Sequence, residues 1–203
     1  MNLDLSGKKI YIEAGANDGV SQSRSLEFVN NPDYFGILIE PHPHAMSKCM
    51  EFRNNGRTVF VHSALVSNDY GGDTIEMHPH SQWNLMTCVS DSLMYKSNPS
   101  DYSDEKFSVP ANTLQAILDG LNVTDVEWFF LDVEGYELEV LRGIDEKTTI
   151  RRLETEQHLK TNYEKELNDI VEECRRLNLT YHGKWVPAQG HPKLHFINYG
   201  DNE

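Results

Sequence analysis

The stretch Ile10-Tyr-Ile-Glu-Ala-Gly-Ala-Asn-Asp-Gly19 decides the fold of this chain. It begins as a short apolar run, passes through an acid and ends in two closely spaced glycines. An apolar run of this length is typical of a buried strand, and a glycine turn at its end lets a ligand approach the backbone. The stretch therefore predicts a ligand-binding turn directly after the first strand.

A second apolar run, Tyr34-Phe-Gly-Ile-Leu-Ile-Glu40, also ends in a carboxylate. A carboxylate at the end of the second strand can accept hydrogen bonds from both hydroxyls of a ribose. Together with the glycine turn, Glu40 predicts a site for a nucleoside cofactor.

Strand and helix patterns alternate along the rest of the chain. We predict strands at residues 10–14, 34–40, 58–65, 128–133 and 150–157, separated by amphipathic helices. Near-continuous apolar strands between helices predict an α/β fold, with a mostly parallel sheet covered on both faces. Residues 66–109 read as an insertion after the third strand, and residues 179–203 as a closing pair of strands. With no repeat or linker, we expect residues 1–203 to form a single domain.

Charge and composition narrow the classes of partner. The chain of 203 residues has 32 acidic and 18 basic side chains and a net charge of −14, which disfavours nucleic acid as a partner. No apolar run approaches a membrane span, and the polar N-terminus does not resemble a secretory signal. The three cysteines are far apart and suggest buried thiols in a reducing compartment. We therefore expect a cytoplasmic protein without membrane contacts.

The third landmark runs from Trp128 to Gly143 and contains Asp132 and Glu134. If the strand continued through both, the two carboxylates would point in one direction, which would suit general-base chemistry or metal binding. Alternatively, Glu134 only caps the helix that follows. The sequence leaves both readings open.

Three motifs together resemble the FkbM family of S-adenosylmethionine-dependent methyltransferases. They are Glu13-Ala-Gly-Ala-Asn-Asp-Gly19, Glu40 in Ile-Glu-Pro, and Leu131-Asp-Val-Glu-Gly-Tyr-Glu-Leu-Glu-Val-Leu-Arg-Gly143. The resemblance covers residues 9–158. It implies the Rossmann-like class I methyltransferase fold, whose seven-stranded sheet has an antiparallel last strand. It also implies O-methylation of a small hydroxylated acceptor, such as a saccharide or a natural product.

The resemblance also assigns roles to residues. Those it places at the cofactor are Glu13, Gly15, Ala16, Asn17, Gly19, Glu40, Ser63, Ala64 and Asp132. The glycine turn would lie under the methionine part of S-adenosylmethionine, Glu40 would hold the ribose, and Ser63 and Ala64 would contact the adenine edge. Asp132 would lie near the amino group or the transferring methyl. Glu13 departs from the family pattern, in which this position is usually Asp.

The residue that removes the acceptor proton stays open at this stage. An alcohol holds its proton tightly, so methyl transfer to it needs a base or a cation nearby. The candidates are Asp132, Glu134, Glu156 and His158. The three acids could instead hold Mg²⁺, and His158 could be a surface histidine that begins a helix.

Three other functions fit the sequence less well than O-methylation. A nicotinamide dehydrogenase would need a middle glycine that Gly15-Ala-Asn-Asp-Gly19 lacks. Methylation of nitrogen or nucleic acid is disfavoured because the sequence lacks an Asn-Pro-Pro-Tyr-type motif. A cofactor-binding pseudoenzyme or scaffold would not need Asp132 and Glu134.

Overall fold

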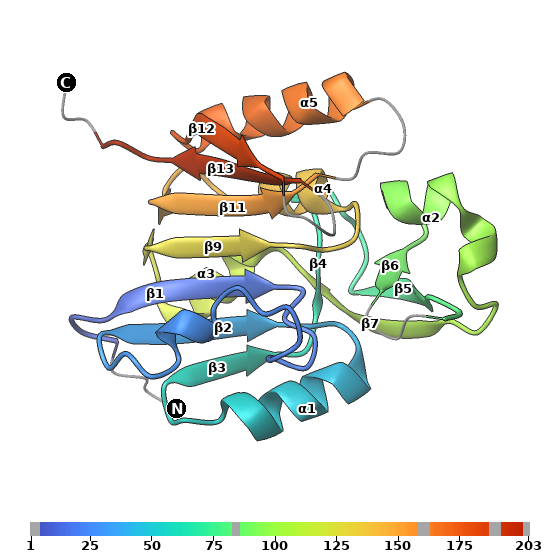
Figure 1. Ribbon diagram of the computed structural model, residues 1–203, viewed down its shortest axis with the longest axis horizontal. Helices are drawn as coiled ribbons and strands as arrows, with labels where there is room; N and C mark the ends of the chain where they lie inside the picture. The colour runs from blue at the N-terminus through green and yellow to red at the C-terminus, as the bar shows by residue number, and fades with distance from the viewer. Residues whose placement is uncertain (1–4, 83–85, 158–162, 187–191, 201–203) are drawn as a thin grey trace.

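The protein is described by a computed structural model that covers residues 5–82, 86–157, 163–186 and 192–200. Its centre is a seven-stranded sheet with the order β12-β13-β11-β9-β1-β2-β3 (Figure 1). The strands are β1 (Lys9–Ala14), β2 (Tyr34–Ile39), β3 (Thr58–Val61), β9 (Trp128–Leu131), β11 (Arg152–Glu156), β12 (Thr180–Trp185) and β13 (Lys193–Ile197).

The sheet is mixed. Strand β1 runs parallel to β2 and β9, and the same direction continues outward to β3 and β11. Strand β13 is antiparallel to both of its neighbours, β11 and β12. The carboxyl ends of β1, β2, β9 and β11 therefore meet at one edge of the sheet, where open α/β folds bind ligands.

Helices cover both faces of this sheet (Figure 1). Alternate strand residues such as Ile12 and Ile37 pack against α3, α4 and α5, whereas Tyr11 and Leu38 face the opposite side with α1 and η1. This alternation divides the core into two layers. The helical segments are α1 (Pro43–Arg53), α3 (Leu114–Leu121), α4 (Glu137–Arg142), α5 (Tyr163–Arg176) and η1 (Leu26–Phe28). None of the helices in the described segments is long and apolar enough to cross a bilayer.

The predicted insertion forms a second, four-stranded sheet beside the carboxyl ends of the main strands (Figure 1). Its strand order is β4-β7-β5-β6. Its elements are β4 (Ala64–Leu65), β5 (Thr74–Pro79), β6 (Thr87–Val89), α2 (Leu93–Ser97), η2 (Pro99–Asp101) and β7 (Phe107–Asn112). A separate parallel pair is formed by β8 (Asp125–Val126) and β10 (Thr149–Ile150).

Three predicted strands differ in extent from the observed ones. The predicted strand 150–157 is divided between β10, which pairs with β8, and β11, which pairs with β9 and β13. The predicted strand 58–65 is divided, because β3 pairs with β2 whereas β4 pairs with β7 of the insertion. The predicted strand 128–133 ends at Leu131, so it does not continue through Asp132 and Glu134. The reading in which strand alternation aligns those two carboxylates is therefore wrong.

Candidate functional site

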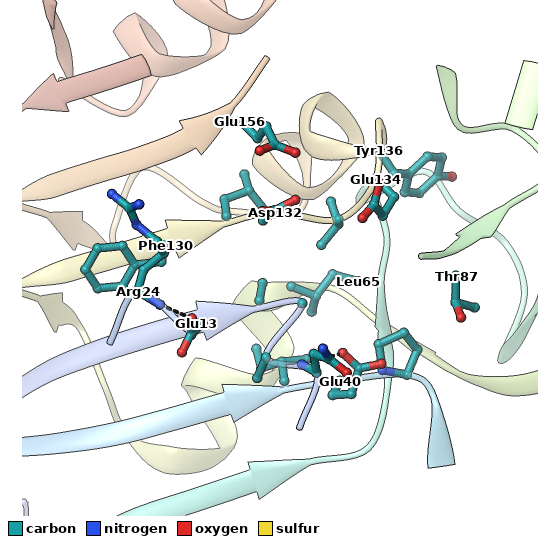
Figure 2. A pocket seen from close by; sticks show the side chains of 18 of the residues that line it. Glu13, Arg24, Glu40, Leu65, Thr87, Phe130, Asp132, Glu134, Tyr136 and Glu156 are labelled. Carbon is teal, nitrogen blue, oxygen red and sulfur yellow. Dashed lines mark hydrogen bonds between the residues drawn. The ribbon is translucent and has the colours of Figure 1, made fainter. Parts of the chain in front are cut away.

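A cavity lies where β1, β2, β9 and β11 end, and the insertion forms part of its wall (Figure 2). Most of the predicted site residues meet here. The predicted residues in its lining are Glu13, Gly15, Ala16, Asn17, Glu40, Ser63, Ala64, Asp132, Glu134 and Glu156. Gly19 lies apart from this lining, and His158 falls outside the described residues.

The glycine turn is fixed between two strand ends. Gly15 has a φ of +81°, and a Cβ there would lie 1.8 Å from the carbonyl oxygen of Asp132. The amides of Gly15 and Ala16 both donate to the carbonyl of Ile39, at 3.0 Å. Only glycine combines this backbone conformation with such a close approach. The turn is therefore held against the ends of β2 and β9.

Glu40 is buried at the end of β2 and faces the cavity (Figure 2). Its Oε2 accepts a hydrogen bond of 2.8 Å from the amide of Asn17, and its Oε1 accepts one of 2.7 Å from the amide of His42. Burial raises the pKa of Glu40 to about 7, although both amides favour the anion. Glu40, the residue predicted to bind the ribose, is thus hydrogen-bonded to the glycine turn that is predicted to lie under the methionine part of the cofactor.

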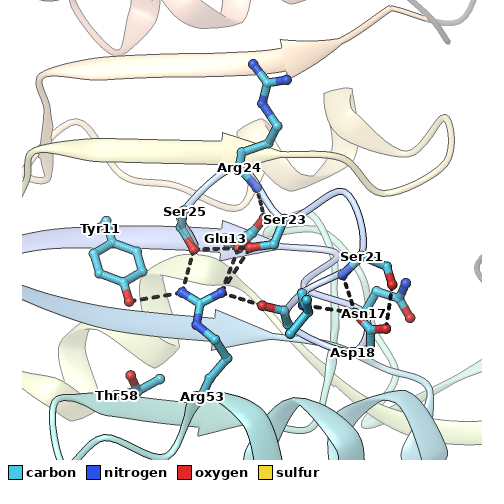
Figure 3. A network of polar contacts seen from close by, with 12 residues as sticks. Tyr11, Glu13, Asn17, Asp18, Ser21, Ser23, Arg24, Ser25, Arg53 and Thr58 are labelled. Atoms are coloured by element: carbon cyan, nitrogen blue, oxygen red, sulfur yellow. Dashed lines mark hydrogen bonds and ion pairs between the residues drawn. The ribbon is translucent and has the colours of Figure 1, made fainter. Parts of the chain in front are cut away.

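Glu13 also lines the cavity, but neighbouring loop residues bind its carboxylate (Figure 3). Oε1 accepts from the amide of Arg24 at 2.7 Å, and Oε2 accepts from the hydroxyls of Ser23 and Ser25 at 2.8 and 2.6 Å. Burial raises the pKa of Glu13 above its usual range despite these bonds and the nearby Arg53. The longer side chain of Glu at this position reaches the loop that follows the glycine turn.

Arg53, at the end of α1, holds the same loop from below (Figure 3). Its Nη1 donates to the carbonyl of Gly19 at 2.7 Å and to Ser23 at 2.9 Å. Its Nη2 donates to Ser25 at 2.9 Å and to Tyr11 at 3.2 Å. Gly19 thus supports the loop through its carbonyl rather than lining the cavity. The sequence pattern of an amphipathic helix did not reveal this role of Arg53.

Ser63 connects the main sheet to the insertion. Its Oγ lies 2.9 Å from the carbonyl oxygen of Pro110 and accepts a hydrogen bond of 2.9 Å from Nδ2 of Asn112. These contacts engage the hydroxyl of Ser63 with β7, while Ala64 adds an apolar side chain to the cavity. The adenine contact assigned to the pair stays a prediction.

Asp132 and Glu134 reach the cavity from the loop between β9 and α4 (Figure 2). Glu134 has a φ of +57°, in the left-handed region that is costly for a residue with a side chain. The N-cap position of α4 belongs to Tyr136, and no side chain of the described residues caps the helix there. Glu137 Oε1 instead holds the loop before the helix, accepting from the amides of Val133 and Gly135 at 2.9 and 3.2 Å. The reading of Glu134 as the cap is therefore wrong.

Lys193, which the sequence did not single out, joins two of the candidate acids. Its Nζ donates to Asp132 Oδ2 at 3.2 Å and to Glu156 Oε1. Burial alone would lower the pKa of Lys193, but the two carboxylates outweigh it and raise the pKa. In sequence, Lys193 is far from both acids. Only the antiparallel register, in which Glu156 pairs with Lys193, brings them together.

The predicted Mg²⁺ site is not supported. No cluster of three His, Cys, Asp or Glu side chains suited to a metal ion occurs in the described part of the chain. Lys193 lies between Asp132 and Glu156, so a fixed positive charge already occupies the space between two of the three proposed ligands. The donor set does not fit a divalent cation.

The insertion supplies the wall opposite the strand ends (Figure 2). Met77, Thr87 and Val89 line the cavity there, and Tyr136 adds an aromatic side chain. The hydroxyl of Thr87 is buried and has no hydrogen-bond partner among the described residues. This wall is mostly apolar and offers one unused hydroxyl to a ligand.

Solved structures support the fold at low sequence identity. A methyltransferase FkbM from Methylobacillus flagellatus KT superposes with a TM-score of 0.57 at 15% identity, covering 96% of this chain and 45% of that one. A precorrin-6y C5,15-methyltransferase from Geobacter metallireducens GS-15 gives 0.50 at 12% identity, covering 97% and 82%. Fibrillarin from Aeropyrum pernix, solved with bound S-adenosylmethionine, gives 0.50 at 12% identity, covering 94% and 66%. The chain thus spans less than half of the first of these proteins.

No curated protein matches the chain significantly. The methyltransferase FkbM domain, in contrast, matches residues 13–183. That match begins at Glu13, before the glycine turn, and includes Glu40, the loop with Asp132 and Glu134, and the insertion. Because it covers most of the sequence, the chain belongs to the FkbM methyltransferase family.

Proposed function

We propose that the chain is an S-adenosylmethionine-dependent methyltransferase that methylates a hydroxyl oxygen of a small, uncharged acceptor such as a saccharide. The observation that carries this proposal is the position of Glu40. Its buried carboxylate lies at the end of β2 and is bonded to the amide of Asn17 in the glycine turn. A carboxylate that can accept hydrogen bonds from a ribose thus lies next to a tight backbone turn, at the edge of the sheet where ligands bind.

The residues of the cavity fit S-adenosylmethionine. The glycine turn leaves backbone exposed beside the end of β9, where a Cβ on Gly15 would clash with Asp132. Asp132 Oδ1 is buried and has no hydrogen-bond partner in the described part of the chain. That oxygen could accept from the amino group of the cofactor, while Glu40 accepts from the ribose hydroxyls.

When bound, S-adenosylmethionine would supply an electrophilic methyl group: the carbon–sulfur bond breaks as the carbon–oxygen bond forms, and the bonding electron pair stays on sulfur. The protein has to orient the acceptor and remove its proton. We assign the proton to the carboxylate of Glu134, which lines the cavity from a strained loop position. The alternatives within the site, Asp132 and Glu156, are both paired with Lys193, so the ammonium already engages an oxygen of each carboxylate.

The charge of the side chains that line the cavity favours an uncharged methyl acceptor. Among the described residues that line the cavity, six are acidic and two, Arg24 and Lys193, are basic. An anionic acceptor such as a nucleotide would be repelled by the excess negative charge. The net charge of −14 acts in the same direction. Nucleic-acid acceptors therefore remain the weaker alternative, and nitrogen acceptors remain weaker because the sequence lacks an Asn-Pro-Pro-Tyr-type motif. The same acidic composition, together with the widely spaced cysteines, supports the cytoplasm as the proposed location.

Calorimetric titration tests the cofactor assignment. We expect micromolar binding of S-adenosylmethionine and of its demethylated product, and none of NAD. Glu40→Ala should weaken binding of both at least about tenfold, because the ribose hydroxyls lose a charged acceptor. Glu51→Ala, which changes an exposed glutamate of α1, is the matched control. Absence of binding to the unmodified protein would leave a scaffold or pseudoenzyme as the better explanation.

An acceptor screen with saccharides then tests the reaction. Glu134→Gln should keep the affinity for S-adenosylmethionine and lower turnover by about 10²-fold or more, because the amide cannot take up the proton. Unchanged turnover in this variant would transfer the base role to Glu156 or His158.

A further inference from the structure

The ammonium group of Lys193 is fixed between two acidic side chains of the cavity. It binds Asp132 from the end of β9 and Glu156 from the end of β11, and the Lys193 side chain is only 12% exposed. Among the described residues, these two carboxylates are its only hydrogen-bond partners. An ammonium has three N–H donors, so one donor remains for a ligand in the cavity.

One oxygen close to this group is unused. Asp132 Oδ1 is buried and has no hydrogen-bond partner in the described part of the chain, whereas Oδ2 of the same carboxylate binds Lys193. Buried polar atoms are rarely left unpaired in a functional state, so this oxygen indicates a polar ligand in the cavity beside Lys193.

We propose that Lys193 takes the place of a divalent cation in this site, and that its ammonium binds the acceptor oxygen directly, so that methyl transfer is independent of metal. This proposal rests on the O-methyltransferase function proposed above. The acceptor proton goes to Glu134, the oxygen forms its new bond to the methyl carbon, and Lys193 keeps all its protons throughout. A fixed cation beside the reacting oxygen stabilises the negative charge that develops as the proton leaves.

The position of Lys193 explains why the three acids do not act as metal ligands. Mg²⁺ requires several oxygen ligands around a small centre. In this protein the ammonium is already hydrogen-bonded to Asp132 and Glu156, and a divalent ion between them would be repelled by it. Removing the ammonium should therefore strengthen the attraction of a divalent ion to Asp132 and Glu156.

Manganese binding tests this without an acceptor. Mn²⁺ would be titrated into the full chain and followed by electron paramagnetic resonance. We expect weak binding by the unmodified protein and binding at least about tenfold tighter by Lys193→Ala, because Asp132 and Glu156 lose the positive charge between them and attract the cation more strongly. The double variant Lys193→Ala/Glu156→Gln should lose that gain. Equal Mn²⁺ affinity in the unmodified protein and in Lys193→Ala would overturn the proposal. If Lys193→Ala does not fold, Lys193→Gln is used in the same way.

Turnover gives the second test once an acceptor is known. We expect EDTA to leave the rate of the unmodified protein unchanged. Lys193→Met should lower kcat by about 10²-fold while the affinity for S-adenosylmethionine changes little, which a purely structural role would not produce. Lys193→Arg, which keeps the charge, should recover part of the rate. Loss of activity in EDTA, or an unchanged kcat in Lys193→Met, would contradict the proposal.

The two proposals can fail separately. If S-adenosylmethionine does not bind to the unmodified protein, the proposed function fails, whatever the Mn²⁺ titration shows. If it binds and methyl transfer requires Mg²⁺, the function stands and the role of Lys193 is wrong.

Discussion

Arg53 Nη1 lies 3.9 Å from the carboxylate of Glu13, directly beneath the loop that follows the glycine turn (Figure 3). Both side chains are buried, at 1% and 4% exposure. The pair ties the end of α1 to the end of β1, and the hydroxyls of Ser23 and Ser25 join the two groups. The loop is thus held by a charged network rather than by apolar packing.

Replacing Arg53 by methionine should destabilise the protein strongly. Glu13 would remain buried without its cation, and breaking a buried pair in this way typically costs about 3–5 kcal/mol. Urea unfolding should show this as a lower midpoint. Arg142→Ala is the control, since Arg142 is largely exposed beside Glu139 and such pairs contribute about 0–1 kcal/mol. Similar midpoints for the two variants would show that the Arg53 network does not stabilise the fold.

The unliganded protein should lose stability as the pH rises from about 4.5 to 7. The pKa of Glu40 is about 7 in the folded state, above its usual value of 4.5, so the folded state keeps a proton that the unfolded state releases. Below pH 4.5 both states are protonated and there is no penalty. Above about pH 7 the loss is complete, at roughly 3 kcal/mol.

Glu40→Gln isolates this contribution, because it removes the titrating group and leaves the others. Urea unfolding of both proteins at pH 4.5 and 7.5 gives the difference. The unmodified protein should lose more free energy of unfolding over this range than the variant. Parallel pH profiles would mean that Glu40 does not titrate with a raised pKa.

Gly15→Ala should prevent cofactor binding and lower stability. The new Cβ would lie 1.8 Å from the carbonyl oxygen of Asp132, a backbone atom that cannot move without displacing β9. The positive φ adds about 1–2 kcal/mol of strain. Gly120→Ala in α3 is the control, because no atom lies within 4 Å of the added Cβ and the helix should gain about 0.5–1 kcal/mol. Thermal unfolding and calorimetry with S-adenosylmethionine measure both effects.

Gly135→Ala should loosen the contact between the insertion and the loop that joins β9 to α4. Gly135 has a φ of +85°, and an added Cβ would lie 3.0 to 3.1 Å from backbone and side-chain atoms of Leu93 and Met94. The amide of Leu93 donates to the carbonyl of Gly135 at 3.0 Å. We expect the Leu93 amide to exchange its hydrogen faster in the variant, while amides of β1 keep their rates. Unchanged exchange at Leu93 would show that the contact tolerates a side chain.

The sequence predicted β1, β2 and β9 because each is a nearly continuous apolar run between turn residues. It also located the glycine turn and Glu40, since these lie at strand ends, where the pattern itself marks the ligand edge. It failed at the loop after Leu131. Residues that follow a strand can still alternate in polarity, so the pattern did not reveal that β9 ends at Leu131 and that Glu134 adopts a positive φ.

The sequence by itself determined the strand and helix order and the family, because hydrophobic periodicity and short motifs are local properties of the chain. The partners of the buried charges were decided only by the tertiary structure. Arg53 meets Glu13, and Lys193 meets Asp132 and Glu156, across distances along the chain that no local pattern encodes. Strand order and antiparallel register bring these groups together, and burial then makes their pairing necessary, since an isolated charge in the interior is too costly to keep.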